Sequence, residues 1–303
     1  MKTRILVKEG EYKLSSAGCM NAKGDAEELY CFLTSTDRVG LFLRAEEEVD
    51  EETETKYREL IARRASRVPL QHITGRQEFM GFRFKVTPDV LVPRQDTETL
   101  VTEAARIIQQ MPRKKQTFMR KLMGKEEVTV LDLCCGSGVI GTSLAKICAD
   151  IREIGTDISE QAVALAKENA AELRANIEFY QGDLFDALSG KELKDLKFDM
   201  IVSNPPYIRT NMIGILQDEV KKFEPMNALD GGRDGLDYYR QIVEKAADYL
   251  KPEGWLLFEI GHDQGEDLRK MLRDAGKYTP AEVIKDLPGR DRVVKCQRKQ
   301  RHV

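Results

Sequence analysis

The sequence predicts an α/β fold: a mostly parallel β-sheet with helices on both faces, preceded by a small helical domain. From residue 128 onward, short apolar runs alternate with helical segments, a pattern typical of strand–helix–strand units. Residues 1–75 instead show only helical patterns. A glycine-rich stretch joins the first apolar run to a helix, as ligand-binding turns of open α/β sheets do.

Two acidic residues mark helix starts in the N-terminal part. Asp25 is expected to cap a helix over residues 26–33, and Asp50 to cap a second helix that ends near Arg64. Pro69 then ends the helical region. We therefore predict a helical N-terminal domain at residues 1–75.

A short connection follows the helical region. Residues 79–86 alternate apolar and polar side chains, which indicates a strand or a hairpin, and a proline-bearing loop follows at 87–96. We assign residues 76–96 as a hairpin and loop linker. A helix at 97–110 then opens the larger domain, 97–303, and we expect the basic residues between 113 and 121 to form a flexible loop.

Composition excludes several classes of protein. The 303 residues are enough for two domains, and 41% hydrophobic and 33% charged residues with a net charge of −3 argue against a dominant nucleic-acid-binding face. No stretch reaches the roughly 18 apolar residues of a membrane span, and the N-terminus lacks a secretory apolar region. The six cysteines form no CxxC pair, so we expect no metal site and a cytoplasmic protein.

Candidate ligand-binding residues stand at the ends of three of the predicted strands. The strand at 128–133 runs into the turn Cys134-Cys135-Gly136-Ser137-Gly138, where a ligand can approach the backbone closely. Asp157 ends the strand at 153–157, a position where a ribose diol is commonly bound. Asp183 ends the strand at 177–181, where its carboxylate suits an adenine amino group with Leu184 against the ring.

Each of these features has a structural alternative. Asp157 can cap the helix that begins at Ser159, Asp183 can shape a turn, and the glycine-rich turn can be purely structural or hold a dinucleotide. Their recurrence at successive strand ends favours a nucleoside site.

The motif Asn204-Pro205-Pro206-Tyr207 closes the apolar strand at 198–203. The prolines fix the backbone, and each residue before a proline is held extended, so the carbonyls point in set directions. An amide, two prolines and an aromatic ring suit a planar amino group. This motif lies at the carboxyl end of its strand, where α/β sheets place their ligands.

These motifs resemble those of class I S-adenosylmethionine-dependent methyltransferases, whose Rossmann-like sheet has seven mostly parallel strands. A narrower resemblance, to the HemK-type family that methylates glutamine in peptide chain release factors, covers nearly the whole chain. It is carried by the following segments: residues 69–75, 78–79, 92–98, 131–133, 136–138, 204–208 and 223–225.

The resemblance implies transfer of a methyl group from S-adenosylmethionine, which leaves S-adenosylhomocysteine, to the amide nitrogen of the glutamine in a Gly-Gly-Gln motif. The implied catalytic residues are Asn204, Pro205 and Tyr207, and together with Pro206 they would bind the substrate. The implied cofactor-binding residues are Cys134, Cys135, Gly136, Ser137, Gly138, Asp157, Asp183, Leu184 and Asn204. The implied partner is a release factor, with no nucleic acid required and no membrane. The resemblance also implies that the helical N-terminal domain, 1–75, is the substrate-recognition domain.

The sequence departs from the family pattern at three positions. Cys134 replaces a glycine, Cys135 replaces a small hydroxylated residue, and Gln95 replaces a proline. A side chain at Cys134 disfavours positive φ, so the cofactor turn either avoids it or is altered. The roles of Arg94, Glu98 and Glu224 stay open.

Other functions compete with this interpretation. The same motif would grip an adenine or guanine amino group, although the chain lacks the basic surface expected for base flipping. A ribosomal-protein glutamine methyltransferase is a nearer alternative. A nicotinamide-dependent dehydrogenase lacks the full GxGxxG spacing, and a non-catalytic nucleoside-binding module would not need the intact motif.

Overall fold

The computed structural model describes residues 1–111, 127–190 and 193–300, and it divides into a helical unit and a larger α/β unit. The basic segment at 113–121 lies outside the described residues. The helical unit holds residues 1–76, 86–88 and 216–224; the larger unit holds 77–85, 89–215 and 225–303. No helix within the described ranges is long and apolar enough to cross a membrane.

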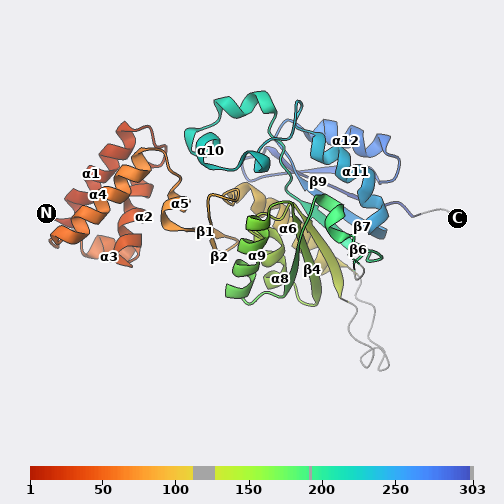
Figure 1. Cartoon of the computed structure of the whole chain (residues 1–303), viewed down its shortest axis with the longest axis horizontal. Coiled ribbons are helices and arrows are strands. Elements are labelled where there is room, and N and C mark those ends of the chain that lie inside the picture. Colours follow the sequence, from red (N-terminus) through yellow and green to blue (C-terminus); the bar gives the residue numbers. More distant parts are fainter. Residues whose placement is uncertain (112–126, 191–192, 301–303) are drawn as a thin grey trace, which may run out of the picture. The chain divides into compact units, whose positions relative to one another are not determined.

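The larger unit is built on one seven-stranded sheet (Figure 1) with the strand order β5-β4-β3-β6-β7-β9-β8. The strands are β3 (Val128–Leu133), β4 (Ile151–Asp157), β5 (Ile177–Gln181), β6 (Phe198–Ser203), β7 (Leu250–Glu259), β8 (Glu282–Lys285) and β9 (Asp291–Gln297). Pairing from β5 through β7 is parallel, and β9 runs antiparallel to both β7 and β8. The predicted mostly parallel sheet is confirmed.

Along each strand the side chains point alternately to the two faces of the sheet, and they form a hydrophobic core on each face. In β3, Leu131 and Leu133 belong to a cluster that includes residues of α11 (Asp237–Tyr249) and α12 (Gly265–Asp274). Val130 faces the opposite way, into a cluster with residues of α6 (Glu98–Gln110) and α8 (Val139–Ile147). Because both faces are covered, the central strands read as nearly continuous apolar runs.

Within the described residues, the larger unit also contains the helix α9 (Glu160–Glu172) and the 3₁₀ segments η1 (Gln95–Thr97), η2 (Leu184–Leu188), η3 (Thr210–Ile215) and η4 (Met226–Ala228).

A two-residue turn joins the hairpin strands β1 (Arg76–Phe79) and β2 (Phe82–Lys85). Met80 and Gly81 both have positive φ, 52° and 76°, as a tight hairpin turn requires. The backbone N–H of Met80 donates to Glu98 Oε1 at 2.7 Å, which anchors the turn to the start of α6. The predicted 76–96 linker is thus divided between the two units.

Six helices form the helical unit: α1 (Thr3–Ser16), α2 (Ala22–Thr34), α3 (Arg38–Leu43), α4 (Glu51–Ala65), α5 (Leu70–Thr74) and α10 (Asp218–Phe223). Asp50 caps α4 as predicted, since its side chain accepts from the backbone N–H of Thr53. The predicted cap at Asp25 is wrong: α2 begins at Ala22, and Asp25 lies buried in its first turn. Pro69 is followed by one more short helix, which ends at the left-handed Gly75.

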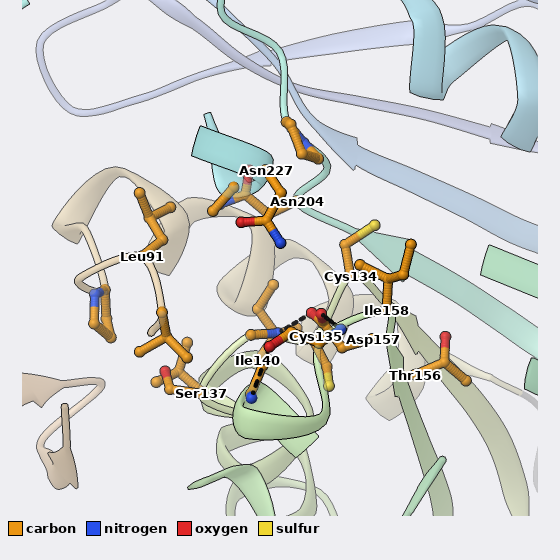
Figure 2. Close-up of a pocket in the computed structure, with 18 of the residues that line it drawn as sticks. Leu91, Cys134, Cys135, Ser137, Ile140, Thr156, Asp157, Ile158, Asn204 and Asn227 are labelled. Atoms are coloured by element: carbon orange, nitrogen blue, oxygen red, sulfur yellow. Dashed lines mark hydrogen bonds between the residues drawn. The ribbon is translucent and has the colours of Figure 1, made fainter. Parts of the chain in front are cut away.

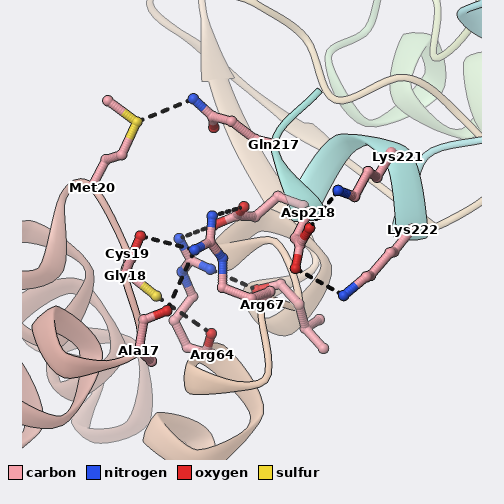
Figure 3. Close-up of polar contacts among 12 residues, drawn as sticks. Ala17, Gly18, Cys19, Met20, Arg64, Arg67, Gln217, Asp218, Lys221 and Lys222 are labelled. Atoms are coloured by element: carbon pink, nitrogen blue, oxygen red, sulfur yellow. Dashed lines mark hydrogen bonds and ion pairs between the residues drawn. The ribbon is translucent and has the colours of Figure 1, made fainter. Parts of the chain in front are cut away.

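A buried ion-pair cluster holds α10 in the helical unit (Figure 3). Arg64 Nε donates to Asp25 Oδ2 at 2.7 Å, and Arg64 Nη2 donates to Glu219 Oε1 at 3.0 Å. Arg67 pairs with the other oxygen of Glu219. Burial alone would raise the pKa of Glu219, but the hydrogen bonds from Arg67 and Arg64 hold this pKa below its ordinary value. The chain therefore leaves the larger unit after Ile215, contributes α10 to the helical unit, and returns at Pro225.

We predict that Glu219→Ala lowers the free energy of unfolding by about 1–3 kcal/mol, because Arg64 and Arg67 lose a shared, largely buried acceptor. Amide hydrogen exchange over residues 218–223 should accelerate. The matched control is Asp218→Ala, which removes more exposed pairs with Lys221 and Lys222 and should lower the free energy of unfolding less than Glu219→Ala does. Equal exchange rates in the two variants would contradict the assigned role of Glu219.

Candidate cofactor and substrate site

One cavity lies at the carboxyl ends of β3, β4, β5 and β6 (Figure 2). It has about 900 Å³ of space outside protein atoms, a figure that includes open solvent at its mouth. Strand order reverses between β4 and β6 around β3, so the cavity sits at the switch point where open α/β sheets bind ligands. In Figure 2, Asn204 and Asn227 lie across the cavity from Asp157.

Most of the predicted site residues line this cavity. They are Cys134, Cys135, Gly136, Ser137, Asp157, Asp183, Leu184, Asn204 and Pro206. Three of the predicted residues, Gly138, Pro205 and Tyr207, do not line it.

The turn from β3 to α8 does use positive φ at Cys134. Its φ is 59°, and that of Gly136 is 53°. The backbone strain that a glycine would avoid is therefore carried by a cysteine, at a cost of roughly 1–2 kcal/mol. Gly138 has another role, since a Cβ there would meet the Cβ of Ala166 at 2.9 Å. It permits close packing of α9 against the turn.

Asp157 ties the turn to the next strand–helix connection. Its Oδ2 accepts from the backbone N–H of Gly136 and its Oδ1 from that of Ser159, both at 2.9 Å. Burial raises the pKa of Asp157, and these backbone hydrogen bonds lower it. Ser159 caps α9 with its own hydroxyl, so Asp157 is not the cap of that helix. Each carboxylate oxygen keeps a lone pair, which suits the two hydroxyls of a ribose.

The connection after β5 places an acid beside an apolar wall. Asp183 is exposed at the cavity, whereas the neighbouring Leu184 is only 6% exposed. Ile158 adds a second apolar side chain to the lining. A carboxylate next to apolar side chains suits a flat base with an exocyclic amino group. The lining residues thus suit the ribose and the base of a nucleoside.

The buried carboxyl group of Asp132 holds the turn between β3 and α8 in place. Asp132, in β3, accepts from the backbone N–H of Gly141 in α8 at 3.1 Å. Burial raises its pKa to about 8, the hydrogen bond from Gly141 lowers it, and Asp157 raises it further. Asp132 therefore fixes the start of α8 relative to β3.

The Asn204-Pro205-Pro206-Tyr207 turn begins directly after β6. Asn204 Nδ2 donates to Thr97 Oγ1 at 3.3 Å, which leaves Oδ1 available. Tyr207 donates its hydroxyl to Glu259 Oε1 at 3.2 Å. Burial and the nearby Glu259 raise the pKa of Tyr207, so the phenol stays protonated.

A glycine-containing loop packs against the backbone of this turn. The backbone N–H of Ile208 donates to the Leu229 carbonyl, and that of Gly231 donates to the Ile208 carbonyl. A Cβ at Gly231 would lie 2.7 Å from the Cα of Tyr207, so only glycine fits there. Gln264 Nε2 donates to the Tyr207 carbonyl at 3.1 Å. The backbone of the turn is therefore held on both sides.

Sequence reasoning missed several residues of the cavity. They include Leu91, Thr97, Ile158, Asn227, Ala228 and Tyr238, whereas Arg94, whose role the sequence leaves open, also lies in the lining. Arg94 and Thr97 lie in the proline-bearing segment that carries part of the family resemblance, and this was a usable signal. Asn227 carried no comparable pattern.

Asp157→Ala should weaken S-adenosylmethionine binding by about 10–100-fold, because a hydrogen bond to a charged group contributes about 1.5–3 kcal/mol. Titration calorimetry measures the affinity, and circular dichroism checks the fold. Asp186→Ala provides the control, since Asp186 is exposed and absent from the cavity lining. An unchanged affinity for Asp157→Ala would remove this residue from the cofactor site.

Comparisons with known proteins agree with this architecture. Residues 6–75 match the family model described as "PrmC N-terminal domain", and residues 124–298 match a "Methyltransferase domain" model. A release factor glutamine methyltransferase of Geobacter sulfurreducens is 41% identical over 281 residues, covering 93% of this chain and 91% of its own. That of Moorella thermoacetica is 39% identical over 302 residues, covering 99% and 100%.

Among solved structures, the catalytic domain of hMettl16, in complex with the MAT2A 3′UTR hairpin 6, superimposes with a TM-score of 0.51. Its sequence identity is 14%, and the match covers 79% of this chain and 81% of that one. The likeness extends to the fold alone.

Proposed function

Because the chain belongs to the release factor glutamine methyltransferase family, we propose that it methylates the glutamine side-chain nitrogen in the Gly-Gly-Gln motif of peptide chain release factors. The observation that carries the proposal is the Asn204-Pro205-Pro206-Tyr207 turn at the cavity that also holds Asp157 and Asp183. Such methylation would modulate translation termination. The site of action would be the cytoplasm, where release factors work.

The main requirement of this reaction is the correct positioning of the substrate nitrogen and the methyl donor. An amide nitrogen is a weak nucleophile, because its lone pair is delocalised into the carbonyl. Bound S-adenosylmethionine supplies a methyl group activated by its positively charged sulfur and is converted to S-adenosylhomocysteine. Holding the nitrogen in line at near-attack distance can supply about 7–11 kcal/mol of the barrier.

Asn204 and Pro205 supply the oxygen acceptors in this proposal. The Asn204 side-chain oxygen and the Pro205 backbone carbonyl would each accept one N–H of the substrate amide. Two fixed acceptors aim the nitrogen at the methyl group and stabilise the positive charge that develops on it. The nitrogen then loses a proton after the new N–C bond has formed, so no strong general base is needed.

Tyr207 has a structural role in this proposal. Its hydroxyl is engaged by Glu259 and its ring packs partly into the core, so we propose that it shapes the wall behind the amide. Pro206 lines the cavity and limits its width at this point.

The helical unit is proposed to recognise the body of the release factor. Relatives named for this activity match along both units, which favours a release factor over a ribosomal protein or a nucleobase as the substrate. No requirement for nucleic acid is proposed.

We expect Asn204→Ala to lower the rate of methyl transfer about 10²–10³-fold, the typical loss when one polar contact to a transition state is deleted. The assay incubates the protein with methyl-labelled S-adenosylmethionine and a release factor, and mass spectrometry locates the modified residue. A release factor with Gly-Gly-Asn in place of Gly-Gly-Gln is the substrate control. A near-normal rate for the variant would refute the role of Asn204, and a label elsewhere would refute the substrate.

A further inference from the structure

We propose that Gln264 is a positioning residue, which holds the Asn204-Pro205-Pro206-Tyr207 turn in place so that its oxygen acceptors meet the substrate amide. Gln264 lies outside the motifs that carry the family resemblance, and it does not line the cavity. The inference rests on the proposed function, because it gives the reason why the Pro205 carbonyl keeps one direction.

The Gln264 side chain joins three loops of the larger unit. Gln264 directly precedes α12 and is only 2% exposed. Its Nε2 donates to the Tyr207 carbonyl and to the Gly235 carbonyl, both at 3.1 Å. Its Oε1 accepts from the backbone N–H of Gly261 at 2.9 Å. These bonds connect the turn after β6, the loop before α11 and the loop after β7.

The three partners allow the Gln264 amide only one orientation. A carbonyl oxygen can only accept a hydrogen bond, and a backbone N–H can only donate one. Nε2 must therefore face the two carbonyls, and both of its protons are used there. A reversed amide would place Oε1 against two carbonyl oxygens and Nε2 against the Gly261 N–H. Because all three partners are backbone groups, this orientation does not depend on the charge or the rotamer of another side chain.

Buried side chains hold the turn at both of its ends. Directly ahead of the turn, Ser203 is fully buried, and its hydroxyl donates to the Leu133 carbonyl at 2.8 Å. At the far end, the Tyr207 carbonyl accepts from Gln264, while the Tyr207 hydroxyl donates to Glu259 Oε1 at 3.2 Å. The main chain and the side chain of Tyr207 are thus both fixed.

The two prolines transmit this restraint along the turn. Their rings fix φ, and each residue ahead of a proline is kept extended. Few soft torsions therefore separate the Tyr207 carbonyl from the Pro205 carbonyl, so a shift of one moves the other. Misplacing a catalytic group by about 1 Å can lower a rate about 10²-fold. Gln264 therefore acts on methyl transfer without touching the substrate.

The first test measures Gln264→Met against the native protein. Methionine has a similar length and no group that donates to a carbonyl, so we expect kcat for methylation of a release factor to fall about 10–100-fold. Affinity for S-adenosylmethionine, measured by titration calorimetry, should change less than kcat, because Gln264 does not line the cavity. The matched control is Gln297→Met, which removes a side-chain bond to the Glu253 carbonyl far from the turn and should keep the native kcat.

The second test uses Gln264→Glu to separate positioning of the turn from support of α12. At about pH 9 the introduced carboxyl is ionised even when buried. It still accepts from the Gly261 N–H, but it cannot donate to the Tyr207 and Gly235 carbonyls. We expect its kcat to be as low as that of Gln264→Met, or lower. A kcat close to the native value would assign the effect to the Gly261 bond and overturn the proposal.

Amide hydrogen exchange provides a readout that needs no substrate. The backbone N–H of Ile208 donates to the Leu229 carbonyl, and that of Gly231 donates to the Ile208 carbonyl. Both amides therefore report on the backbone next to Tyr207. Their exchange should accelerate in Gln264→Met and stay at the native rate in Gln297→Met.

The outcomes separate the two proposals. A native kcat in Gln264→Met, unchanged exchange at Ile208 and Gly231, or equal losses of kcat and cofactor affinity would each overturn the role of Gln264. If exchange accelerates as expected but the native protein transfers no methyl group to the release factor, the role of Gln264 in fixing the turn is supported and the proposed substrate is wrong.

Discussion

The pairing of β3 with β4 on one side and with β6 on the other is the constraint on which the site depends. Both pairings are parallel, so the carboxyl ends of the three strands meet at one edge of the sheet. The chain must leave β3 in one direction and return to the sheet on the other side, and this opens a crevice between the connections. The glycine-rich turn, Asp157 and Asn204 converge because each directly follows one of these strands.

The central strands could be predicted closely, and the physical reason is their burial. The apolar runs at 128–133 and 198–203 coincide with β3 and β6, because strands covered on both faces leave an uninterrupted apolar signal. The helical unit was less predictable. Asp25 looks like a helix cap in sequence, but its partner Arg64 lies 39 residues away, and local patterns do not show such a pair.

The same limit applies within the site. Residues that follow a strand were predicted, since the strand end gives their position. The contacts of Thr97 with Asn204 and of Glu259 with Tyr207 were missed, because they join side chains far apart in the sequence and form only in the folded chain. The positive φ of Cys134 shows the converse case. The sequence alone leaves open whether Cys134 adopts a positive φ, and only the backbone geometry shows that it does.

The membership of α10 in the helical unit affects how this architecture can be recombined. The unit is discontinuous in sequence, because α10 is encoded between Tyr207 and Asn227 of the other unit. A cut near residue 76 would separate Glu219 from Arg64 and Arg67. A chimera that exchanges recognition domains between relatives therefore has to transplant two separate gene segments together, and natural divergence of substrate preference faces the same coupling.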